Sequence, residues 1–329
     1  MEDLKQRSLR TIIFISLVLF TLRLTAQVST FNQLGSLPST NPAFIANLGK
    51  DQLALISRNQ WPGNKIGSFT SELSYNKFFE NINSSFGILA NYSFDHQGSL
   101  SSLSQSLQYG YRVLFLDRFY LCTGLGLNHK TTELDLNNFQ YLYEPKRTYL
   151  ILPEKMITSE SSSASAGIFL HDWMENQYLG FSIKDQPVMQ LKNSGSGQLQ
   201  ISPSFSIQGM KGIPWTREVL LISLFEIERT GKMVYTIPDT GTTVLHPSYY
   251  YFSFQENVYI NRLFMFGIGY KYFTKNYGCF NARLNFFKLG DLPLLIGFSV
   301  DTKPYIQNDR IKTNSGYEFY LKYSFYKGR

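Results

Sequence analysis

The sequence lacks long apolar runs outside its extreme N-terminus. Because a helix needs about 20 apolar residues to cross a bilayer, a bundle of transmembrane helices is excluded. Cysteine is also scarce, since Cys122 and Cys279 are the only two and lie far apart in strand-like runs. We expect both thiols to be unpaired. The 31 basic and 24 acidic residues give a net charge of +7. The basic residues are spread along the chain and no aromatic RNA motif accompanies them, so nucleic acid is not an expected partner.

Catalytic signatures are absent as well. The chain has four histidines, His96, His129, His171 and His246, and His171 is followed by Asp172 at the end of a predicted strand. Adjacent residues of a strand point to opposite faces, so this pair is not a catalytic dyad. The sequence contains no Gly-x-Ser-x-Gly, no His-Glu-x-x-His and no cysteine pair at metal-binding spacing. We therefore predict that the protein is not an enzyme and has no catalytic, cofactor or metal site.

Aromatic residues are abundant, with 22 Tyr and 27 Phe making up most of a 16% aromatic content. Four segments near the C-terminus alternate large apolar residues with small, polar or charged ones. The apolar positions begin at Phe264, Phe280, Leu294 and Tyr317, and the last series runs through Phe319, Leu321, Tyr323 and Phe325. Side chains alternate between the two faces of a strand, so each segment predicts a strand with one apolar face.

Lipid is the medium that best fits this apolar face. Transmembrane barrels have an apolar outer band, aromatic girdles and a polar lumen, built from strands of about 9–11 residues. Only alternate residues then meet lipid, which agrees with a mean hydropathy of −0.17. We predict an all-β fold, a transmembrane antiparallel β-barrel located in an outer membrane.

The N-terminus resembles an export signal. Lys5, Arg7 and Arg10 precede an apolar run, and Ala26 is the expected cleavage point. A single membrane anchor is the alternative, although the run is short for a spanning helix. We predict a signal peptide over 1–26, an irregular leader over 27–50 that plugs the periplasmic mouth, and a barrel over 51–329.

Fourteen strands are expected in the barrel, an even number as in bacterial single-chain barrels. Met233 to Ile237 could add a weak extra strand. The longest loop is expected from Thr131 to Ser161, outside the membrane, and another from Lys303 to Asn314. The predicted strands are 51–58, 68–78, 84–95, 103–115, 118–129, 162–171, 178–184, 199–209, 218–228, 249–260, 263–273, 277–288, 292–301 and 315–325.

Two distinctive sequence motifs lie within the leader and shortly after it. Ser39-Thr40-Asn41-Pro42-Ala43-Phe44 is followed by Arg58-Asn59-Gln60-Trp61-Pro62-Gly63. This order and spacing resembles the PorP/SprF family of the Bacteroidetes type IX secretion system, and further matches such as Gly124-Leu125-Gly126-Leu127 run along the mature chain. Two roles are open for the second motif: Trp61 is an anchor at the membrane interface, or Arg58, Gln60 and Trp61 hold the leader or contact a partner. The candidate family-motif or partner-contact residues are Asn41, Pro42, Ala43, Arg58, Gln60, Trp61 and Gly63.

The resemblance also implies a function. The barrel would assist type IX secretion by exporting, or anchoring, a large surface protein that carries a type IX C-terminal domain, such as a gliding adhesin, together with other secretion components. The alternative is a plugged transporter of small hydrophobic or polar solutes, similar to long-chain fatty acid channels. A purely structural barrel is a third possibility. Charges expected in the lumen, which would set selectivity in a transporter, are Arg112, Glu226, Glu228, Arg283 and Lys322.

Overall fold

The computed structural model describes most of the chain that follows residue 36. The described residues are 37–47, 51–60, 68–95, 100–135, 156–193, 198–237, 241–246, 248, 250–261, 264–273, 277–287, 294–307 and 310–325. The predicted signal peptide and the first part of the leader lie outside them.

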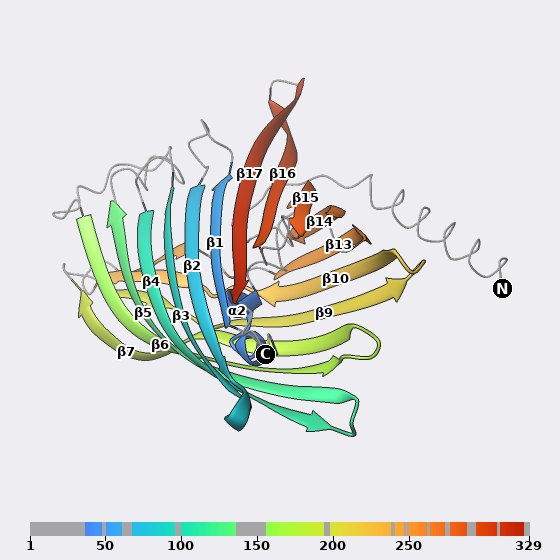
Figure 1. The fold of residues 1–329 in the computed structure, drawn as a ribbon. Coiled ribbons are helices and arrows are strands. Elements are labelled where there is room, and N and C mark those ends of the chain that lie inside the picture. Colours follow the sequence, from blue (N-terminus) through green and yellow to red (C-terminus); the bar gives the residue numbers. More distant parts are fainter. Residues whose placement is uncertain are drawn as a thin grey trace.

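Fourteen antiparallel strands form a closed barrel (Figure 1). Each strand pairs with its neighbour along the chain, and β1 closes the ring by pairing with β17, from Asp51 opposite Phe325 to Asn59 opposite Tyr317. The predicted barrel is therefore confirmed. The wall strands are β1 (Asp51–Gln60), β2 (Ser68–Phe79), β3 (Ser84–Asp95), β4 (Leu100–Phe115), β5 (Phe119–Asp135), β6 (Met156–Asp172), β7 (Gln177–Asn193), β9 (Ser204–Pro214), β10 (Val219–Arg229), β13 (Tyr250–Ile260), β14 (Phe264–Phe273), β15 (Tyr277–Phe287), β16 (Leu294–Gln307) and β17 (Arg310–Phe325).

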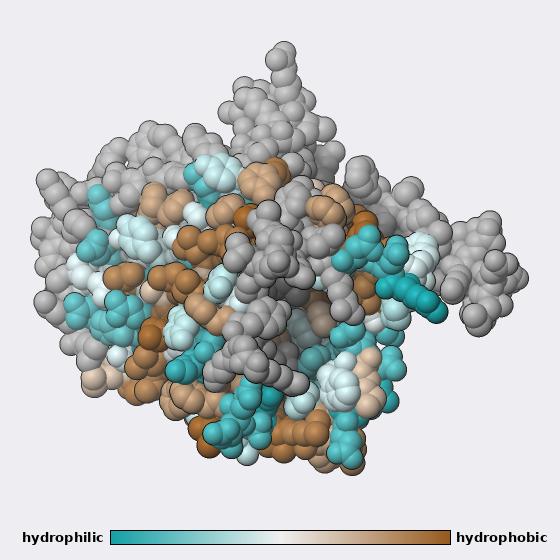
Figure 2. All heavy atoms as spheres, viewed as in Figure 1, coloured by the Kyte–Doolittle hydropathy of each residue, from teal (hydrophilic) through white to brown (hydrophobic). Residues whose placement is uncertain are grey.

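The wall has its apolar face outside and its polar face inside. Leu107 and Leu127 are 64% and 66% exposed, whereas Gln255 and Asn257 are fully buried. Hydrophobic side chains accordingly lie over the strands on the outer surface (Figure 2). This distribution is the reverse of a soluble protein's and is that of a barrel with a lipid-facing exterior.

The two ends of the barrel differ in their connections. Short turns such as 116–118, 173–176 and 215–218 lie at one end, together with the start of β1 and the end of β17. We call this the turn end. The opposite end, the loop end, has the longer connections between β5 and β6, β7 and β9, and β10 and β13.

Three short strands form a separate sheet within the loop-end connections. They are β8 (Gln198–Ile201), β11 (Met233–Ile237) and β12 (Gly241–His246), in the order β12-β11-β8. The weak strand expected from Met233 to Ile237 exists but does not belong to the wall. The predicted strand 199–209 is wrong, because Ser202 and Pro203 interrupt it and separate β8 from β9.

Strands extend into two of the predicted loops. β5 continues to Asp135 and β6 starts at Met156, so both enter the predicted loop 131–161, whose middle lies outside the described residues. The predicted loop 303–314 forms the outer part of a long β16–β17 hairpin, from Lys303 opposite Asn314 to Gln307 opposite Arg310 (Figure 1). Pro304 is compatible with this hairpin because an edge strand tolerates a missing backbone donor.

Candidate functional site

A short segment of the leader lies inside the barrel. It comprises α2 (Leu37–Thr40), Asn41 to Ala43, and α3 (Phe44–Asn47), and we call it the inner segment (Figure 1). Two backbone carbonyls tie it to the wall, since Gln108 Nε2 donates to Pro38 O at 3.1 Å and Ser182 Oγ donates to Thr40 O at 2.8 Å. The segment is thus bound to β4 on one side and to β7 on another.

Asn41 organises the centre of the inner segment. Its Oδ1 accepts a hydrogen bond from the Ala43 amide at 2.9 Å, while its Nδ2 donates to the Phe181 carbonyl at 3.2 Å. The Phe44 amide donates to the Asn41 carbonyl at 3.1 Å and begins α3. Pro42 fixes one backbone dihedral at this corner. Asn41 and Ala43 are fully buried, so this part of the family motif contacts the barrel's own wall.

Phe44 anchors the inner segment in an aromatic cluster. Its ring centroid lies 4.6 Å from that of Phe169 and 5.1 Å from that of Tyr178. Cys122 and Leu224 complete the buried core around it. Cys122 is a free thiol, as expected, and the side chain of Cys279 lies outside the described residues. The cluster is an apolar core near the turn end of the barrel.

Glycines in the wall make room for the inner segment. Gly110, Gly124 and Gly167 are directly opposite one another across β4, β5 and β6. A Cβ at Gly110 would meet Ile45 and Ala46, one at Gly124 would overlap the backbone of Pro42 and Ala43, and one at Gly167 would overlap Asn41. Close approach of two backbones requires residues without side chains.

The remaining motif residues lie elsewhere. Arg58 and Gln60 are on β1, where they are 3% and 2% exposed and occupy positions whose side chains face the lumen. Arg58 is opposite both Glu318 and Thr70 in the strand register. Trp61 and Gly63 lie outside the described residues. The motif therefore divides into an inner-segment part and a lumen-facing part on β1.

The predicted lumen charges are mostly in the interior. Glu226 and Glu228 are buried, and Lys322 is half-buried with the inward parity of β17. The Arg112 guanidinium lies over the ring of Phe78, 4.2 Å from its centroid, and 5.0 Å from that of Tyr120. The side chain of Arg283 lies outside the described residues.

Sequence reasoning missed the partner of Glu228. Lys184 Nζ donates to Glu228 Oε2 at 3.1 Å, and the Tyr251 hydroxyl donates to the same oxygen at 3.0 Å. Gln208 Nε2 reaches Glu226 at 3.4 Å. The sequence does indicate that Lys184 faces the lumen. It lies two positions after Ser182, and alternate residues of this strand, Tyr178, Gly180 and Ser182, face inward.

Comparison with known proteins identifies the family. The model of the type IX secretion system membrane protein PorP/SprF matches residues 24–323. The chain belongs to this family. It is accordingly a type IX secretion protein of the outer membrane, as predicted, and its family implies other secretion components as neighbours. No curated protein matches the chain.

Solved structures share the fold of this PorP/SprF protein. The CymD monoaromatic hydrocarbon channel has a TM-score of 0.55 and 12% identity, covering 92% of this chain and 95% of that chain. The toluene transporter TbuX of Ralstonia pickettii has a TM-score of 0.53 and 10% identity, with coverages of 93% and 100%. The toluene transporter TodX of Pseudomonas putida gives 0.52 and 10%, with coverages of 92% and 95%. These matches are to outer-membrane barrels and concern the fold alone.

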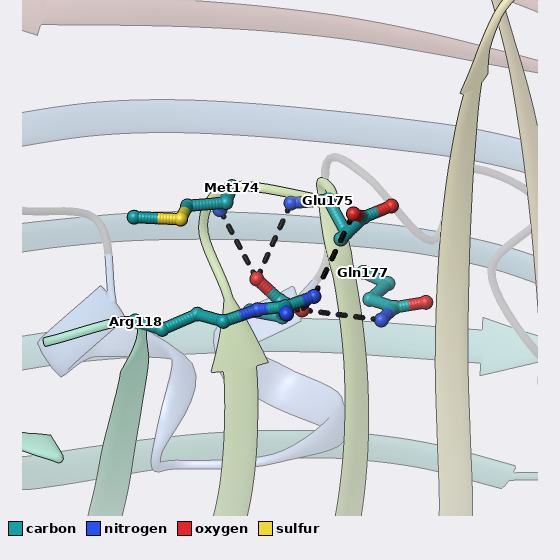
Figure 3. Close-up of polar contacts among 5 residues, drawn as sticks. Arg118, Met174, Glu175 and Gln177 are labelled. Atoms are coloured by element: carbon teal, nitrogen blue, oxygen red, sulfur yellow. Dashed lines mark hydrogen bonds and ion pairs between the residues drawn. The ribbon is translucent and has the colours of Figure 1, made fainter. Parts of the chain in front are cut away.

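An ion pair and several hydrogen bonds join two neighbouring turns at the turn end. Arg118, after β4, donates through Nε and Nη2 to Asp172 Oδ2 at 2.9 and 2.5 Å. The amides of Met174 and Glu175 and the side chain of Gln177 also donate to this carboxylate (Figure 3). The Arg118 hydrogen bonds are the main reason why the pKa of Asp172 falls from 3.8 to about 2. Sequence patterns gave no sign of this contact between turns that are distant in sequence.

In the described part of the chain, no cluster of three or more His, Cys, Asp or Glu side chains could hold a metal ion. Among the same residues no helix is long and apolar enough to cross a membrane.

Proposed function

We propose that this PorP/SprF barrel exports, or anchors at the cell surface, a large secreted protein through that protein's C-terminal domain. The observation that carries the proposal is the family match over residues 24–323 of a closed barrel. The partner would be a surface protein of the gliding-adhesin kind. A stiff wall with long connections at its loop end is suited to presenting contact residues to such a partner.

The inner segment fits a plug in this proposal. It occupies the turn-end half of the lumen, where Ala43, Phe44 and Ala46 are fully buried against β3, β4 and β5. A plug would keep the periplasm separated from the outside while the loop end remains available to the partner. The preceding residues, with the predicted export signal over 1–26, would deliver the chain to the outer membrane.

Transport of small solutes is the second candidate, favoured by the fold shared with channels for monoaromatic hydrocarbons and toluene. The lumen chemistry argues against an apolar solute. Buried carboxyl and amide groups line the interior, and transfer of an apolar molecule past them gains little from burial. These interior residues are Gln52, Glu72, Gln208, Glu226, Gln255 and Glu318.

Affinity purification from the native host tests the proposal. The tagged protein would be extracted from the outer membrane in mild detergent, and co-purifying proteins would be identified by mass spectrometry. We expect one large surface protein with a type IX C-terminal domain, and loss of that protein from the cell surface when the barrel's gene is deleted. An empty barrel, unchanged surface proteins and solute-dependent current in a planar bilayer would favour the transporter.

A further inference from the structure

A wall of short hydroxyl side chains faces the lumen above the inner segment. It is formed by the loop-end halves of β4, β5 and β6, on the side of Gln108 that is remote from the turn end. We call it the hydroxyl wall. Its residues are Ser102, Ser104, Ser106, Asn128, Lys130, Thr132, Ser159, Ser161 and Ser163.

The strand register arranges these residues in three rows. Thr132 lies between Ser102 and Ser159, Lys130 between Ser104 and Ser161, and Asn128 between Ser106 and Ser163. Each row therefore has a central residue flanked by two serines. Cross-strand neighbours in such rows are about 4.5–5.5 Å apart at Cβ, so one ligand group could contact a whole row.

Accessibility differs between the rows of the hydroxyl wall, since Thr132 and Ser159 of the row nearest the loop end are 2% and 4% exposed. Inward residues next to the inner segment, such as Gly110, Cys122 and Gly124, are buried, but Ser104, Lys130 and Ser161 are only half-buried. Gln108, which is adjacent to the hydroxyl wall on β4, binds Pro38 of the inner segment. A molecule entering from the loop end would meet the hydroxyl wall before it met the inner segment.

Lys130 is the only cation in the three rows. Within the described residues its ammonium group has neither an ion-pair nor a hydrogen-bond partner, in contrast to Lys184, which is paired with Glu228. The inward-facing Ser106 is 4% exposed, and its Oγ has no hydrogen-bond partner in the same part of the chain. A hydroxyl can donate to an anion, and an ammonium can add a charge-assisted hydrogen bond.

We propose that the hydroxyl wall binds a carboxylate of an extended polypeptide segment that enters from the loop end, with Lys130 as the charged contact and Ser104 and Ser161 as flanking donors. The inference rests on the proposed function, because it identifies the bound segment as part of the surface protein. It adds the place of binding, inside the lumen, and the chemistry of recognition. An acidic polysaccharide offers the same carboxylate chemistry but is not expected to be the ligand, since the proposed partner is a protein.

Isothermal titration with a deca-glutamate peptide tests the site on the full-length barrel in detergent. We expect Lys130→Met to weaken binding about tenfold or more, as for loss of a hydrogen bond to a charged group. Lys130→Arg retains the charge and should bind within a few-fold of the wild type. Ser104→Val should weaken binding by a smaller factor. Lys77→Met is the matched control, because Lys77 is exposed on the outer face of β2 and should have no effect.

Folding of each variant would be checked by the heat-dependent gel mobility that folded barrels show. Equal affinity of the wild type and Lys130→Met for deca-glutamate would overturn the inference. Deca-glutamine that binds as tightly as deca-glutamate would overturn the role of the carboxylate. Alginate oligomers that bind more tightly than the peptide would identify a polysaccharide site and overturn the peptide assignment.

Cell experiments separate this inference from the proposed function. If deletion of the gene releases a surface protein but Lys130→Met retains it, the proposed function stands and the hydroxyl wall is not its binding site. If deletion leaves every surface protein in place, the proposed function fails. The titration decides in either case whether Lys130 recognises a carboxylate.

Discussion

The Ala43 backbone nitrogen lies so close to the inner face of Gly124 that a Cβ at position 124 would overlap it. This contact joins two parts of the chain that are far apart in sequence, the leader and β5. It also explains a glycine in a strand, where a glycine usually costs stability. The wall and the inner segment are therefore complementary in shape at this point.

Gly124→Val should displace the inner segment while leaving the barrel closed. The added side chain cannot be accommodated by the Pro42 and Ala43 backbone, and overpacking of this kind costs about 1–3 kcal/mol. We expect higher single-channel conductance in a planar bilayer. Gly87→Ala is the control, because a Cβ there meets its nearest neighbour, Ile45, at an ordinary 3.5 Å. Unchanged conductance in Gly124→Val would show that the inner segment does not limit passage.

Asn41→Leu should loosen the inner segment without adding bulk. The substitution removes the hydrogen bonds to the Ala43 amide and the Phe181 carbonyl, and leaving buried groups unsatisfied costs about 1–3 kcal/mol each. We expect faster hydrogen exchange at Ala43 to Ala46, measured by mass spectrometry. Asn81→Leu, at an exposed position, is the control. Exchange equal to that of the wild type would contradict the role of Asn41.

The barrel architecture was predictable because it depends on the alternation of apolar and polar residues within each strand. Phe264 to Phe273 and Tyr317 to Phe325 show on their own that one face is apolar, and the repeat of this pattern gave the fourteen wall strands. Strand ends were harder, because Thr131, Ser159 and Pro304 occur in loops as readily as in strands that extend beyond the membrane. Local patterns do not report how far a strand continues in water.

The position of the inner segment could not be read from the sequence. Gly110, Gly124 and Gly167 are separated along the chain, and only the barrel register makes them neighbours. The motif at Asn41 to Ala43 could be recognised, but its contact with Phe181 depends on the tertiary structure. Long-range complementarity of this kind leaves no periodic signal.

Acid should weaken the contact between the two turns joined by Arg118 and Asp172. The folded pKa of Asp172, about 2, is below its ordinary value of 3.8, so its contribution is complete above about pH 4 and is lost as the pH falls toward 2. Asp172→Asn should lose this contribution at neutral pH and show a flatter stability profile between pH 4 and 2. Thermal unfolding in detergent measures it, with the exposed Asp117→Asn as control. Parallel profiles for the wild type and Asp172→Asn would contradict the assignment.

Substitution of Lys184 and substitution of Glu228, which form an ion pair in the lumen, should lower the stability of the barrel by different amounts. Lys184 lies close to both Glu226 and Glu228, so Lys184→Met leaves two carboxylates without their cation, whereas Glu228→Gln leaves Lys184 beside Glu226. Breaking a buried pair costs about 3–5 kcal/mol, and we expect Lys184→Met to be the more damaging. Urea unfolding would measure both variants and the double variant Lys184→Met/Glu228→Leu. The reverse order would mean that Glu226 does not interact with Lys184.

The orientation of the barrel is testable in intact cells. The connection between β5 and β6 joins the loop ends of both strands, and the short turn 173–176 lies at the opposite end. A protease site inserted between residues 140 and 150, which lie outside the described residues, should be cleaved in whole cells because long loops of such barrels face outward. The same site inserted between Glu175 and Asn176 should be cleaved only after the outer membrane is opened. Cleavage of the second insertion in intact cells, with protection of the first, would reverse the orientation and put the hydroxyl wall on the periplasmic side.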